Sequence, residues 1–390
     1  MKYDFTYQNP VRVHFGRNAM ENLAGELENV GESVVLIYGG GSIKRNGIYD
    51  QVISALRTAG KRVSEISGVM PNPTYAKLCE GIKIAREAKA DFLLAVGGGS
   101  VIDYAKGVSL GVHATCDVWQ HYYIDFGDII NPLVPVGSVL TMAGTGSEAN
   151  AGSVITNEAL KIKAGRTFPR ELTPRFAILN PEFTYTVSAY QMKSGAFDAI
   201  SHLMEIYFSG DDDNVSDYLV EGLLRSLITA TPRAVANPRD YEARSNIMWA
   251  STLALMTLVG QSKTQDWMVH MIEHQIGAYT DCAHGMGLSA ISPAYYRLIC
   301  GASEASVAKF ARFARVVWGV GLNADDATAA KMGIDALEKF IKDSGMVTNL
   351  KELGVTEEMI EPIANSAIIL DSGYKKLTRE EIAQILRESM

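Results

Sequence analysis

The sequence predicts a protein of two domains: an α/β domain over residues 1–185, then an all-α domain over residues 186–390. In the first half, short apolar runs that end in glycines alternate with amphipathic segments, as expected of a largely parallel sheet covered by helices. Beyond about residue 186 the strand-like runs disappear, and long segments with apolar residues at three- and four-residue steps follow. With 390 residues, the chain is long enough for each half to bury its own core.

The α/β pattern is clearest in two strands and two helices. The runs VVLIYGG (34–40) and DFLLAVGGG (91–99) are apolar and rich in β-branched or bulky residues, so we expect buried strands. The segments YDQVISALRTAG (49–60) and YAKLCEGIKIAREAKA (75–90) carry apolar residues with helical spacing. Strands that alternate with such helices favour parallel pairing.

The second half is expected to contain helices only. Their ends are expected at Pro232, Pro238 and Gly319, because proline and glycine commonly stop helices. The boundary between the two halves falls near NPEFTYTVSAYQ (180–191). The clearest helical patterns cover residues 190–209, 214–232, 244–260 and 306–319.

Composition limits the classes of function. The formal net charge of −8 argues against nucleic acid or an anionic membrane as the main partner. No apolar run approaches the roughly 18 residues needed to cross a bilayer, and the N-terminus is too polar for a signal peptide. Four cysteines without CxxC spacing indicate a reducing compartment, so we expect a soluble cytoplasmic protein.

A glycine loop follows the second predicted strand. In AVGGGSVIDYAKG (95–107), three glycines separate a strand from a helix, and Asp103 falls in the first turn of that helix. Phosphate binds at such places, because the backbone approaches closely and free amides face the ligand. A tight strand-to-helix turn is the alternative interpretation. The candidate cofactor-binding residues are Gly97, Gly98, Gly99, Ser100 and Asp103.

Two further loops are of the same kind. IYGGGSIKRNG (37–47) follows the first strand, and LTMAGTGSEANAGSVIT (140–156) brings the hydroxyls of Thr141, Thr145 and Ser147. In a parallel sheet, loops after successive strands emerge at one edge, which is the usual ligand-binding edge. Together the three loops predict a Rossmann-like dinucleotide-binding domain.

The first loop also bears on the choice of nucleotide. NAD sites commonly place an acidic residue at a strand end to hold the ribose, whereas NADP sites carry small and basic residues there. Here Gly40, Gly41 and Ser42 follow the strand, with Lys44 and Arg45 nearby. This composition favours NADP(H), although solvent-facing basic residues on an ordinary turn are the alternative.

Histidines suggest a metal site in the second half. Three of the seven histidines lie within residues 270–285, and His270 and His274 share a helix face. Asp198 and His202 have the same four-residue spacing, so two helices could deliver oxygen and nitrogen ligands to a Zn(II) or Fe(II) ion. A hydrogen-bonded core histidine is the alternative at any one position. Spacing alone leaves open whether His274 or His284 completes the set.

Distinctive segments occur along the whole chain: FTYQNPVRVHFG, YGGGSIKRNG, AVGGGSVIDYAKG, TMAGTGSEAN, GAFDAISHLMEIYFS, DDDNVSDYLVEGLLRS and H-x3-H-x9-H followed by Gly285. In these segments the sequence resembles the iron-containing alcohol dehydrogenases over essentially its whole length, most closely their butanol dehydrogenase and NADPH-dependent aldehyde reductase branch. One departure is Asn180 before Pro181, where relatives often have Asp-Pro.

The resemblance implies a dehydroquinate synthase-like fold, an N-terminal nucleotide domain and a C-terminal metal domain. It assigns a divalent metal, Fe(II) or Zn(II), to the positions of Asp198, His202, His270 and His284. It places His274 beside the substrate, as an orienting or proton-relaying group, and it adds Thr141, Thr145 and Lys163 to the cofactor contacts. It also implies a homodimer.

The expected activity is a metal-dependent, NAD(P)H-linked alcohol dehydrogenase or aldehyde reductase for short- to medium-chain aliphatic substrates such as butanol and butanal. Two alternatives keep the fold. A dehydroquinate synthase-like lyase would need basic residues around the metal motifs, and we find no such cluster in the sequence. A non-catalytic nucleotide-binding protein would not need four intact ligand positions beside intact glycine loops.

Overall fold

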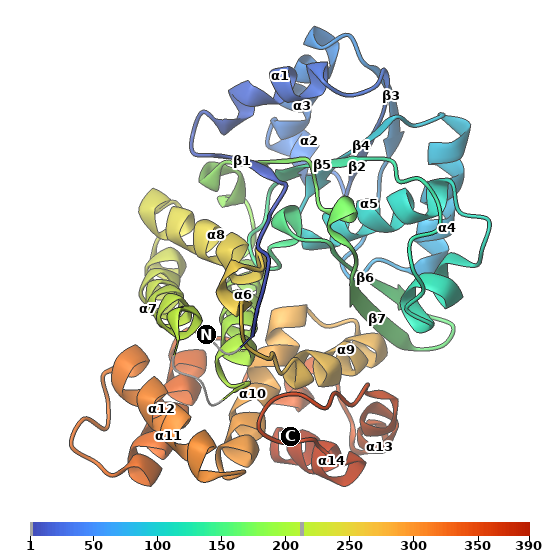
Figure 1. The fold of residues 1–390 in the computed structure, drawn as a ribbon. Helices are drawn as coiled ribbons and strands as arrows, with labels where there is room; N and C mark the ends of the chain where they lie inside the picture. Colours follow the sequence, from blue (N-terminus) through green and yellow to red (C-terminus); the bar gives the residue numbers. More distant parts are fainter. Residues whose placement is uncertain (1–2, 211–213) are drawn as a thin grey trace. The chain divides into compact units, whose positions relative to one another are not determined.

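The computed structural model describes residues 3–210 and 214–390. The chain forms two compact units. One is an α/β unit of residues 8–188, and the other is a helical unit of residues 189–390 together with the N-terminal residues up to Tyr7 (Figure 1). The predicted boundary between residues 185 and 186 lies three residues before this division.

The α/β unit is built on a six-stranded sheet with strand order β1-β8-β5-β4-β2-β3. Every pair in it is parallel, which confirms the predicted sheet type. Strands β2 and β4 are buried at every residue, because helices cover both faces of the sheet. The strands are β1 (Arg12–Phe15), β2 (Ser33–Tyr38), β3 (Arg62–Ile66), β4 (Phe92–Gly97), β5 (Val136–Leu140) and β8 (Phe176–Leu179).

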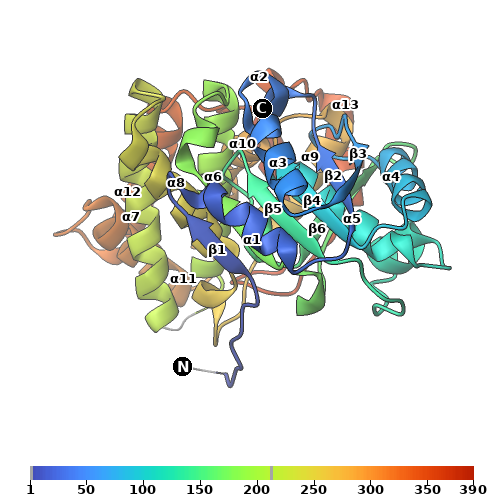
Figure 2. The same ribbon diagram turned by 90° about the horizontal axis from the view of Figure 1, so that it is seen from above.

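Two pairs of helices cover the sheet. Helices α1 (Leu23–Glu28) and α3 (Ile48–Thr58) pack their leucines and Val52 into one core with β2, β4 and β8. Helices α5 (Gly99–Val112) and α4 (Tyr75–Glu87) form the second pair, in which α5 packs on β4 and β5, and α4 packs on α5. Figure 2 shows α3 and α5 flanking the central strands.

An antiparallel hairpin of β6 (Gly152–Asn157) and β7 (Ile162–Thr167) lies outside the main sheet. It packs on α5, and the backbone N–H of Thr156 donates to the carbonyl of Pro73, in the loop that follows β3. The short elements of this unit are η1 (Ala19–Asn22), α2 (Ser42–Arg45), η2 (Trp119–Ile124), η3 (Ser147–Ala149), η4 (Arg170–Leu172) and η5 (Pro181–Thr184).

The helical unit contains no strand among described residues 189–210 and 214–390, in agreement with the predicted fold class. Its central helix α6 is buried along nearly its whole length and packs against α7, α8 and α10 (Figure 2). The helices are α6 (Ala189–Tyr207), α7 (Val215–Ala236), α8 (Tyr241–Leu255), η6 (Leu258–Gly260), α9 (Met268–Thr280), α10 (His284–Cys300), α11 (Glu304–Phe313), η7 (Ala314–Trp318), α12 (Asp326–Asp343), η8 (Leu350–Leu353), α13 (Glu357–Ser366) and α14 (Arg379–Glu388).

The helix end predicted at Pro232 is wrong. Helix α7 continues through Pro232 to Ala236, because Ala230 and Ala234 on either side are buried and their packing outweighs the hydrogen bond that proline cannot make. Pro238 does follow the end of α7, and Gly319 ends η7 with a left-handed φ of 69°. No helix of the described residues is long and apolar enough to span a membrane.

Candidate active site

The strand order of the α/β unit indicates where a nucleotide would bind. From β2 the chain proceeds to β3 on one side and then returns to β4 on the other side. In such doubly wound sheets the ligand binds outside the carboxyl ends of the strands at this reversal. The loop after β2 and the loop after β4 are the two glycine loops that the sequence singled out, Gly39–Ser42 and Gly97–Ser100. The structure therefore brings both loops to one edge.

Glycines in these loops meet conformational and steric demands. Gly41 has a left-handed φ of 87°, which side chains other than glycine rarely adopt. A Cβ at Gly99 would lie 2.3 Å from Oγ1 of Thr145, so only glycine allows the loop after β5 to pack on the start of α5. The backbone N–H of Thr141 donates to the carbonyl of Gly97 at 2.9 Å, which ties these two loops together.

Asp103 lies on α5 beyond its first turn, so its predicted place in that turn is wrong, and its side chain is engaged within the protein. Its Oδ1 accepts a hydrogen bond from Ser147 Oγ at 2.5 Å, and its Oδ2 accepts one from the backbone N–H of Val154 at 3.0 Å. The side chain thus joins α5 to the loop after β5 and to the hairpin. Lys163, on β7, is also buried. Thr141, Thr145, Ser147 and Asp103 therefore lie on connected segments, as the sequence suggested.

Lys106 is a residue that sequence reasoning missed. It is fully buried and donates to the backbone carbonyls of Ser147 and Gly152 at 2.7 and 2.8 Å. Burial lowers the pKa of Lys106 to about 8, although Asp103 and Glu148 oppose this change. The signal in the sequence was a lysine inside an apolar helix run, YAKGVSL. Through these hydrogen bonds, Lys106 anchors the segment between β5 and β6 to helix α5.

Lys44 does not stand free in solvent. Its Nζ lies 4.5 Å from the ring centroid of Tyr49 and 5.0 Å from that of Tyr38, and 3.8 Å from Glu65 Oε2. Glu65, on β3, accepts hydrogen bonds from the hydroxyls of Tyr38 and Tyr49 at 2.6 and 2.5 Å. Partial burial opposes ionisation of Glu65, but these bonds and Lys44 lower its pKa. The sequence-based interpretation overlooked this carboxylate, because it lies on another strand.

The metal-site residues converge in the helical unit. Asp198 and His202 come from α6, His270 from α9, and His284 is the first residue of α10. Oδ1 of Asp198 lies 3.2 Å from Nε2 of His202 and 3.5 Å from Nε2 of both His270 and His284. The structure therefore brings together the four positions that the resemblance implied.

The donor atoms of this cluster fit a divalent cation. Two atoms bound to one tetrahedral ion at about 2.0–2.1 Å would lie roughly 3.4 Å apart, close to the distances observed around Asp198. Within the described part of the chain, Oδ1 of Asp198 and Nε2 of His270 are buried without a hydrogen-bond partner. One carboxylate and three imidazoles form the mixed oxygen and nitrogen set that Zn(II) and Fe(II) accept.

The protonation of the cluster reflects its charges. Burial would raise the pKa of Asp198, but the surrounding imidazoles outweigh it and hold that pKa far below its ordinary value. Burial lowers the pKa of His202 to about 3. Burial would also lower the pKa of His270, but Glu205 and Asp198 outweigh it and raise the pKa to about 10.

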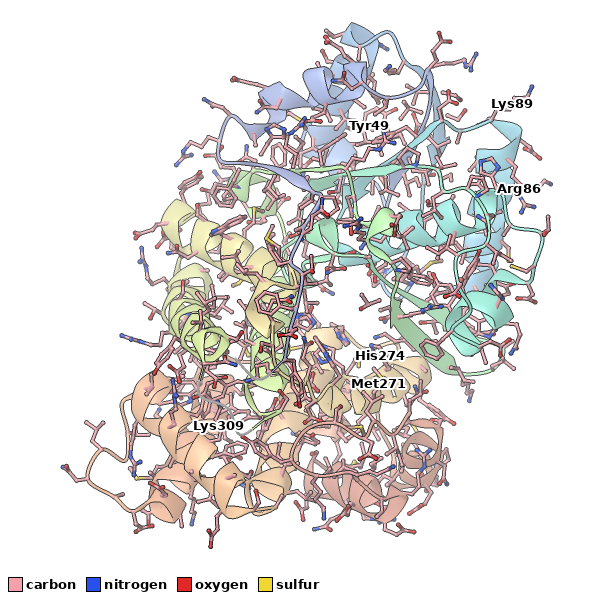
Figure 3. All side chains as sticks on the ribbon, in the orientation of Figure 1. Tyr49, Arg86, Lys89, Met271, His274 and Lys309 are labelled. Carbon is pink, nitrogen blue, oxygen red and sulfur yellow. The ribbon has the colours of Figure 1, made fainter. Side chains whose placement is uncertain are left out.

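His274 lies one turn along α9 from His270 and is buried (Figure 3). Its ring centroid is 6.4 Å from that of His270 and 5.6 Å from that of His284. Its imidazole, His284 and Glu273 also offer atoms within 4.8 Å of one another, a second group beside the first. Trp267 packs against the cluster, with its ring 5.3 Å from His270.

Sequence reasoning missed two buried glutamates that contact these histidines. Glu205 on α6 bonds to Nδ1 of His270, and Glu273 on α9 bonds to Nδ1 of His284. Both side chains have no exposed surface. The available signal was a charged residue inside an apolar helix segment, SHLMEIYF in one case and HMIEHQI in the other.

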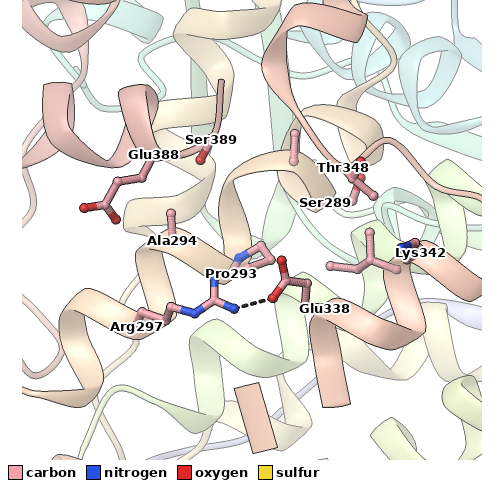
Figure 4. A pocket seen from close by; sticks show the side chains of 11 residues that line it. Ser289, Pro293, Ala294, Arg297, Glu338, Lys342, Thr348, Glu388 and Ser389 are labelled. Carbon is pink, nitrogen blue, oxygen red and sulfur yellow. Dashed lines mark hydrogen bonds and ion pairs between the residues drawn. The ribbon is translucent and has the colours of Figure 1, made fainter. Parts of the chain in front are cut away.

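A separate cavity of about 330 Å³ lies among α10, α12 and the C-terminal segment (Figure 4). Arg297 and Glu338 form an ion pair across it. The hydroxyls of Ser289 and Ser389 in its wall donate to the backbone carbonyls of Val347 and Ile385. Because these polar groups are already satisfied within the protein, we assign the cavity no ligand.

Comparison with known proteins supports this interpretation. Residues 10–181 match the family described as iron-containing alcohol dehydrogenase, and residues 192–390 match the C-terminal part of the Fe-containing alcohol dehydrogenase family. NADH-dependent butanol dehydrogenase B of Clostridium acetobutylicum is 36% identical over 99% of this chain and 100% of its own length. NADPH-dependent aldehyde reductase YqhD of Escherichia coli is 36% identical over 90% of this chain and 89% of its own length.

The fold agrees with solved structures. The crystal structure of NADH-dependent butanol dehydrogenase A from Thermotoga maritima superposes with a TM-score of 0.93, at 35% identity over 99% of this chain and 98% of that chain. The matched segments contain both glycine loops and the histidine cluster. The chain belongs to the iron-containing alcohol dehydrogenase family, in its butanol dehydrogenase and aldehyde reductase branch, and is an NAD(P)-dependent alcohol dehydrogenase.

Proposed function

We propose that the enzyme interconverts short- to medium-chain aliphatic aldehydes and alcohols, such as butanal and butanol, with NADP(H) favoured over NAD(H). The observation that carries the proposal is the convergence of Asp198 with three imidazole nitrogens at distances that suit one divalent ion. Similarity to butanol dehydrogenases and to an aldehyde reductase supports the substrate class.

In this proposal, Asp198, His202, His270 and His284 hold one Fe(II) or Zn(II) ion. When bound, the ion supplies a Lewis acid that polarises a carbonyl oxygen, and the nicotinamide supplies the hydride. Because these four side chains come from three packed helices, their positions are fixed before substrate arrives. Such preorganisation lowers the cost of aligning the reacting groups.

His274 serves as the catalytic residue in our proposal. It is buried, its ring centroid lies 5.6 Å from that of His284, and the resemblance places it beside the substrate rather than among the four ligands. A ring nitrogen of His274 would donate a proton as an aldehyde is reduced and accept it as an alcohol is oxidised. Trp267 adds an apolar ring 5.3 Å from that of His270, which would favour an aliphatic substrate over a charged one.

The proposed cofactor contacts lie on the loops at the carboxyl edge of the sheet. The loop after β2 has no acidic residue, which leaves room for a 2′-phosphate on the adenosine ribose, and Lys44 is close by. Glu65 offsets part of that positive charge, so the preference for NADP(H) should be moderate. The proposed contacts are Gly40, Gly41, Ser42, Lys44, Gly97, Gly98, Gly99, Ser100, Asp103, Thr141, Thr145 and Lys163.

We also propose a homodimer. Tyr3, Phe5 and Tyr7 form an exposed aromatic stretch near the N-terminus. Exposed aromatic groups of this kind are common in protein interfaces. Light scattering of the purified protein measures its oligomeric state directly. A monomer at the concentration used in the activity assay would rule the dimer out.

The activity test is reduction of butanal by metal-loaded protein, followed by the absorbance of the reduced nicotinamide. We expect oxidation of NADPH, faster than of NADH at equal concentration, and loss of turnover on chelation. A clear preference for NADH would leave the activity standing but would refute our interpretation of the loop after β2. Failure to turn over any aliphatic aldehyde with either cofactor would refute the proposed substrate class.

A further inference from the structure

We propose that Glu205 and Glu273 are positioning residues of the metal centre. Each holds the imidazole of one ligand by Nδ1, so that Nε2 faces the ion, and each adds a negative charge that strengthens cation binding. This inference rests on the metal centre proposed above. It goes beyond it because neither glutamate belongs to the four-ligand set.

Glu205 connects two helices at His270. Its carboxylate contacts Nδ1 of His270, and its Oε1 accepts the backbone N–H of Val269 at 2.6 Å. It also accepts the backbone N–H of His270 at 3.3 Å. One carboxylate from α6 therefore fixes both the first turn of α9 and the ring of the ligand that α9 carries. The rotation of that ring is determined by a fully buried group.

Glu273 does the same for His284. It lies on α9, its Oε2 contacts Nδ1 of His284, and the side chain has no exposed surface. Space for it is provided by Gly287, because a Cβ at that position would lie 2.7 Å from Cγ of Glu273. A second ligand is thus oriented by a carboxylate from a neighbouring helix.

The two contacts determine which ring nitrogen is available. A proton on Nδ1 that is donated to a carboxylate leaves the lone pair on Nε2. The Nε2 atoms of His270 and His284 are the ones that lie 3.5 Å from Oδ1 of Asp198. Orientation by the two glutamates and convergence on Asp198 therefore agree for both rings.

Buried charge makes a second, independent argument. Asp198, Glu205 and Glu273 are three buried carboxylates that each contact or approach an imidazole of this cluster. Buried charges are costly unless a partner compensates them. A divalent cation would add two positive charges beside these carboxylates. Glu205 and Glu273 should therefore raise the affinity for the ion as well as orient its histidine ligands.

His202 provides an internal contrast. Among the described residues, its Nδ1 has no hydrogen-bond partner, so no carboxylate orients the third imidazole. The positioning role is confined to the ligands on α9 and α10. Helix α6 instead places Asp198 and His202 by their four-residue spacing.

The test measures metal affinity of the full-length protein. Metal-free protein is titrated with Zn(II) in competition with a chromophoric chelator, and with Co(II), whose visible absorption reports ligand geometry. The variants are Glu205→Gln and Glu273→Gln, singly and together, because glutamine still accepts a hydrogen bond but carries no charge. Glu26→Gln is the matched control, since Glu26 is a carboxylate that bonds to a histidine, His14, at 2.8 Å but belongs to the α/β unit.

We expect each substitution to weaken Zn(II) binding by about 10–100-fold and to alter the Co(II) spectrum, with a larger effect in the double variant. Glu26→Gln should bind both ions as the parent does. Affinities within about twofold of the parent in both single variants would overturn the inference. Two ions bound per chain, the second at Glu273, His274 and His284, would also overturn it, because Glu273 would then be a ligand.

A measurement on the unaltered protein covers the case in which the variants fail to fold. Long-range proton–nitrogen spectra of zinc-loaded protein with labelled imidazoles distinguish the nitrogen that binds the ion from the one that carries a proton. We expect His270 and His284 to bind through Nε2 and to keep a strongly hydrogen-bonded proton on Nδ1. Binding through Nδ1 at either histidine would overturn the inference, whereas absence of any bound zinc would refute the proposed metal centre itself.

Discussion

His270 and His274 lie one helical turn apart on α9, yet their surroundings differ. The Nδ1 atom of His270 contacts Glu205, and its Nε2 atom approaches Asp198. This is the arrangement expected of a metal ligand that a second residue orients. His274 is near His284 but is not one of the imidazoles around Asp198. The same four-residue spacing therefore supports two different roles.

Replacing these two histidines separates the roles. We expect His270→Ala to lose both bound metal and turnover, because one of four donors is removed and the buried carboxylate of Glu205 loses its imidazole partner. His274→Ala should keep stoichiometric metal and lose about 100-fold or more in turnover, the usual contribution of a general acid or base. Metal analysis and butanal reduction check both; retained metal in His270→Ala would contradict the assignment.

Cofactor choice should respond to Glu65. Glu65→Gln keeps acceptors for Tyr38 and Tyr49 but removes the negative charge that offsets Lys44. We expect the ratio of kcat/KM for NADPH over NADH to rise by about threefold to fivefold at most, since solvent screens an exposed ion pair. Glu32→Gln, just before the opposite end of β2, is the control. An unchanged ratio in Glu65→Gln would remove this residue from cofactor selection.

Metal affinity should depend on pH through His270. With its pKa raised to about 10, chiefly by Glu205 against the effect of burial, His270 is protonated in the metal-free protein at neutral pH, and an ion must displace that proton. His202, with a pKa lowered to about 3 by burial, needs no deprotonation. Affinity should therefore fall about tenfold for each pH unit lowered between roughly 8 and 6. Chelator competition at several pH values measures this slope, and a flat profile would contradict it.

At single positions, sequence reasoning found the residues that repeat with helical spacing and missed those that act across helices. Asp198 and His202, and likewise His270 and His274, share helix faces that can be read from the chain alone. Glu205 meets His270 across 65 positions of sequence, and Glu65 on β3 meets Lys44 on α2. Those pairs depend on tertiary packing, which spacing does not encode.

Among the elements, the contact between α6 and α10 is unusually close. A Cβ at Gly285 would lie 1.9 Å from the backbone oxygen of Ser194, and the N–H of Gly285 donates to Ser194 Oγ at 3.0 Å. Gly285 directly follows His284. The close approach of α6 and α10 therefore determines where α10 begins. This places its first residue, His284, next to Asp198 on α6.

Gly285→Ala tests this contact. The added Cβ must push α10 away from α6, so we expect a loss of about 1–3 kcal/mol in the free energy of unfolding and at least about tenfold weaker zinc binding. Gly222→Ala is the matched control, because its Cβ would meet nothing within 4 Å on helix α7. That control should gain about 0.5–1 kcal/mol. Unaltered zinc affinity in Gly285→Ala would show that α10 has room to adjust.

The elements themselves were largely predictable, but their ends were less so. Strand β2 and helix α4 follow their predicted segments closely, because continuous apolar runs and three- to four-residue periodicity are local signals. Helix α7 passes its predicted stop at Pro232, since buried packing outweighs a local preference. Helix α8 ends at Leu255 and not at the predicted residue 260. The chain leaves the helical conformation there, because Thr257 takes a left-handed φ of 69°. The order of strands in the sheet depends on contacts far apart in sequence and could not be read from periodicity.

At the scale of the whole molecule, the metal should act as a structural brace of the helical unit. Its proposed ligands come from α6, α9 and α10, so an ion bound to the folded state alone adds stability by mass action. At a hundredfold excess over its dissociation constant this gain is about 2.7 kcal/mol. We expect chelation to lower Tm by about 5–10 °C, measured by calorimetry with and without added zinc. An unchanged Tm in metal-loaded and chelated samples would contradict this role.

The division of the chain into two units has a consequence for recombination between related enzymes. Every proposed cofactor contact falls between Gly40 and Lys163, and every proposed metal ligand falls between Asp198 and His284, with the unit boundary at residue 188 between them. A single crossover at that boundary would exchange the determinants of nucleotide choice without altering one metal-binding position. Recombination within this family can therefore vary cofactor and metal independently, and a chimera should take each property from a different parent.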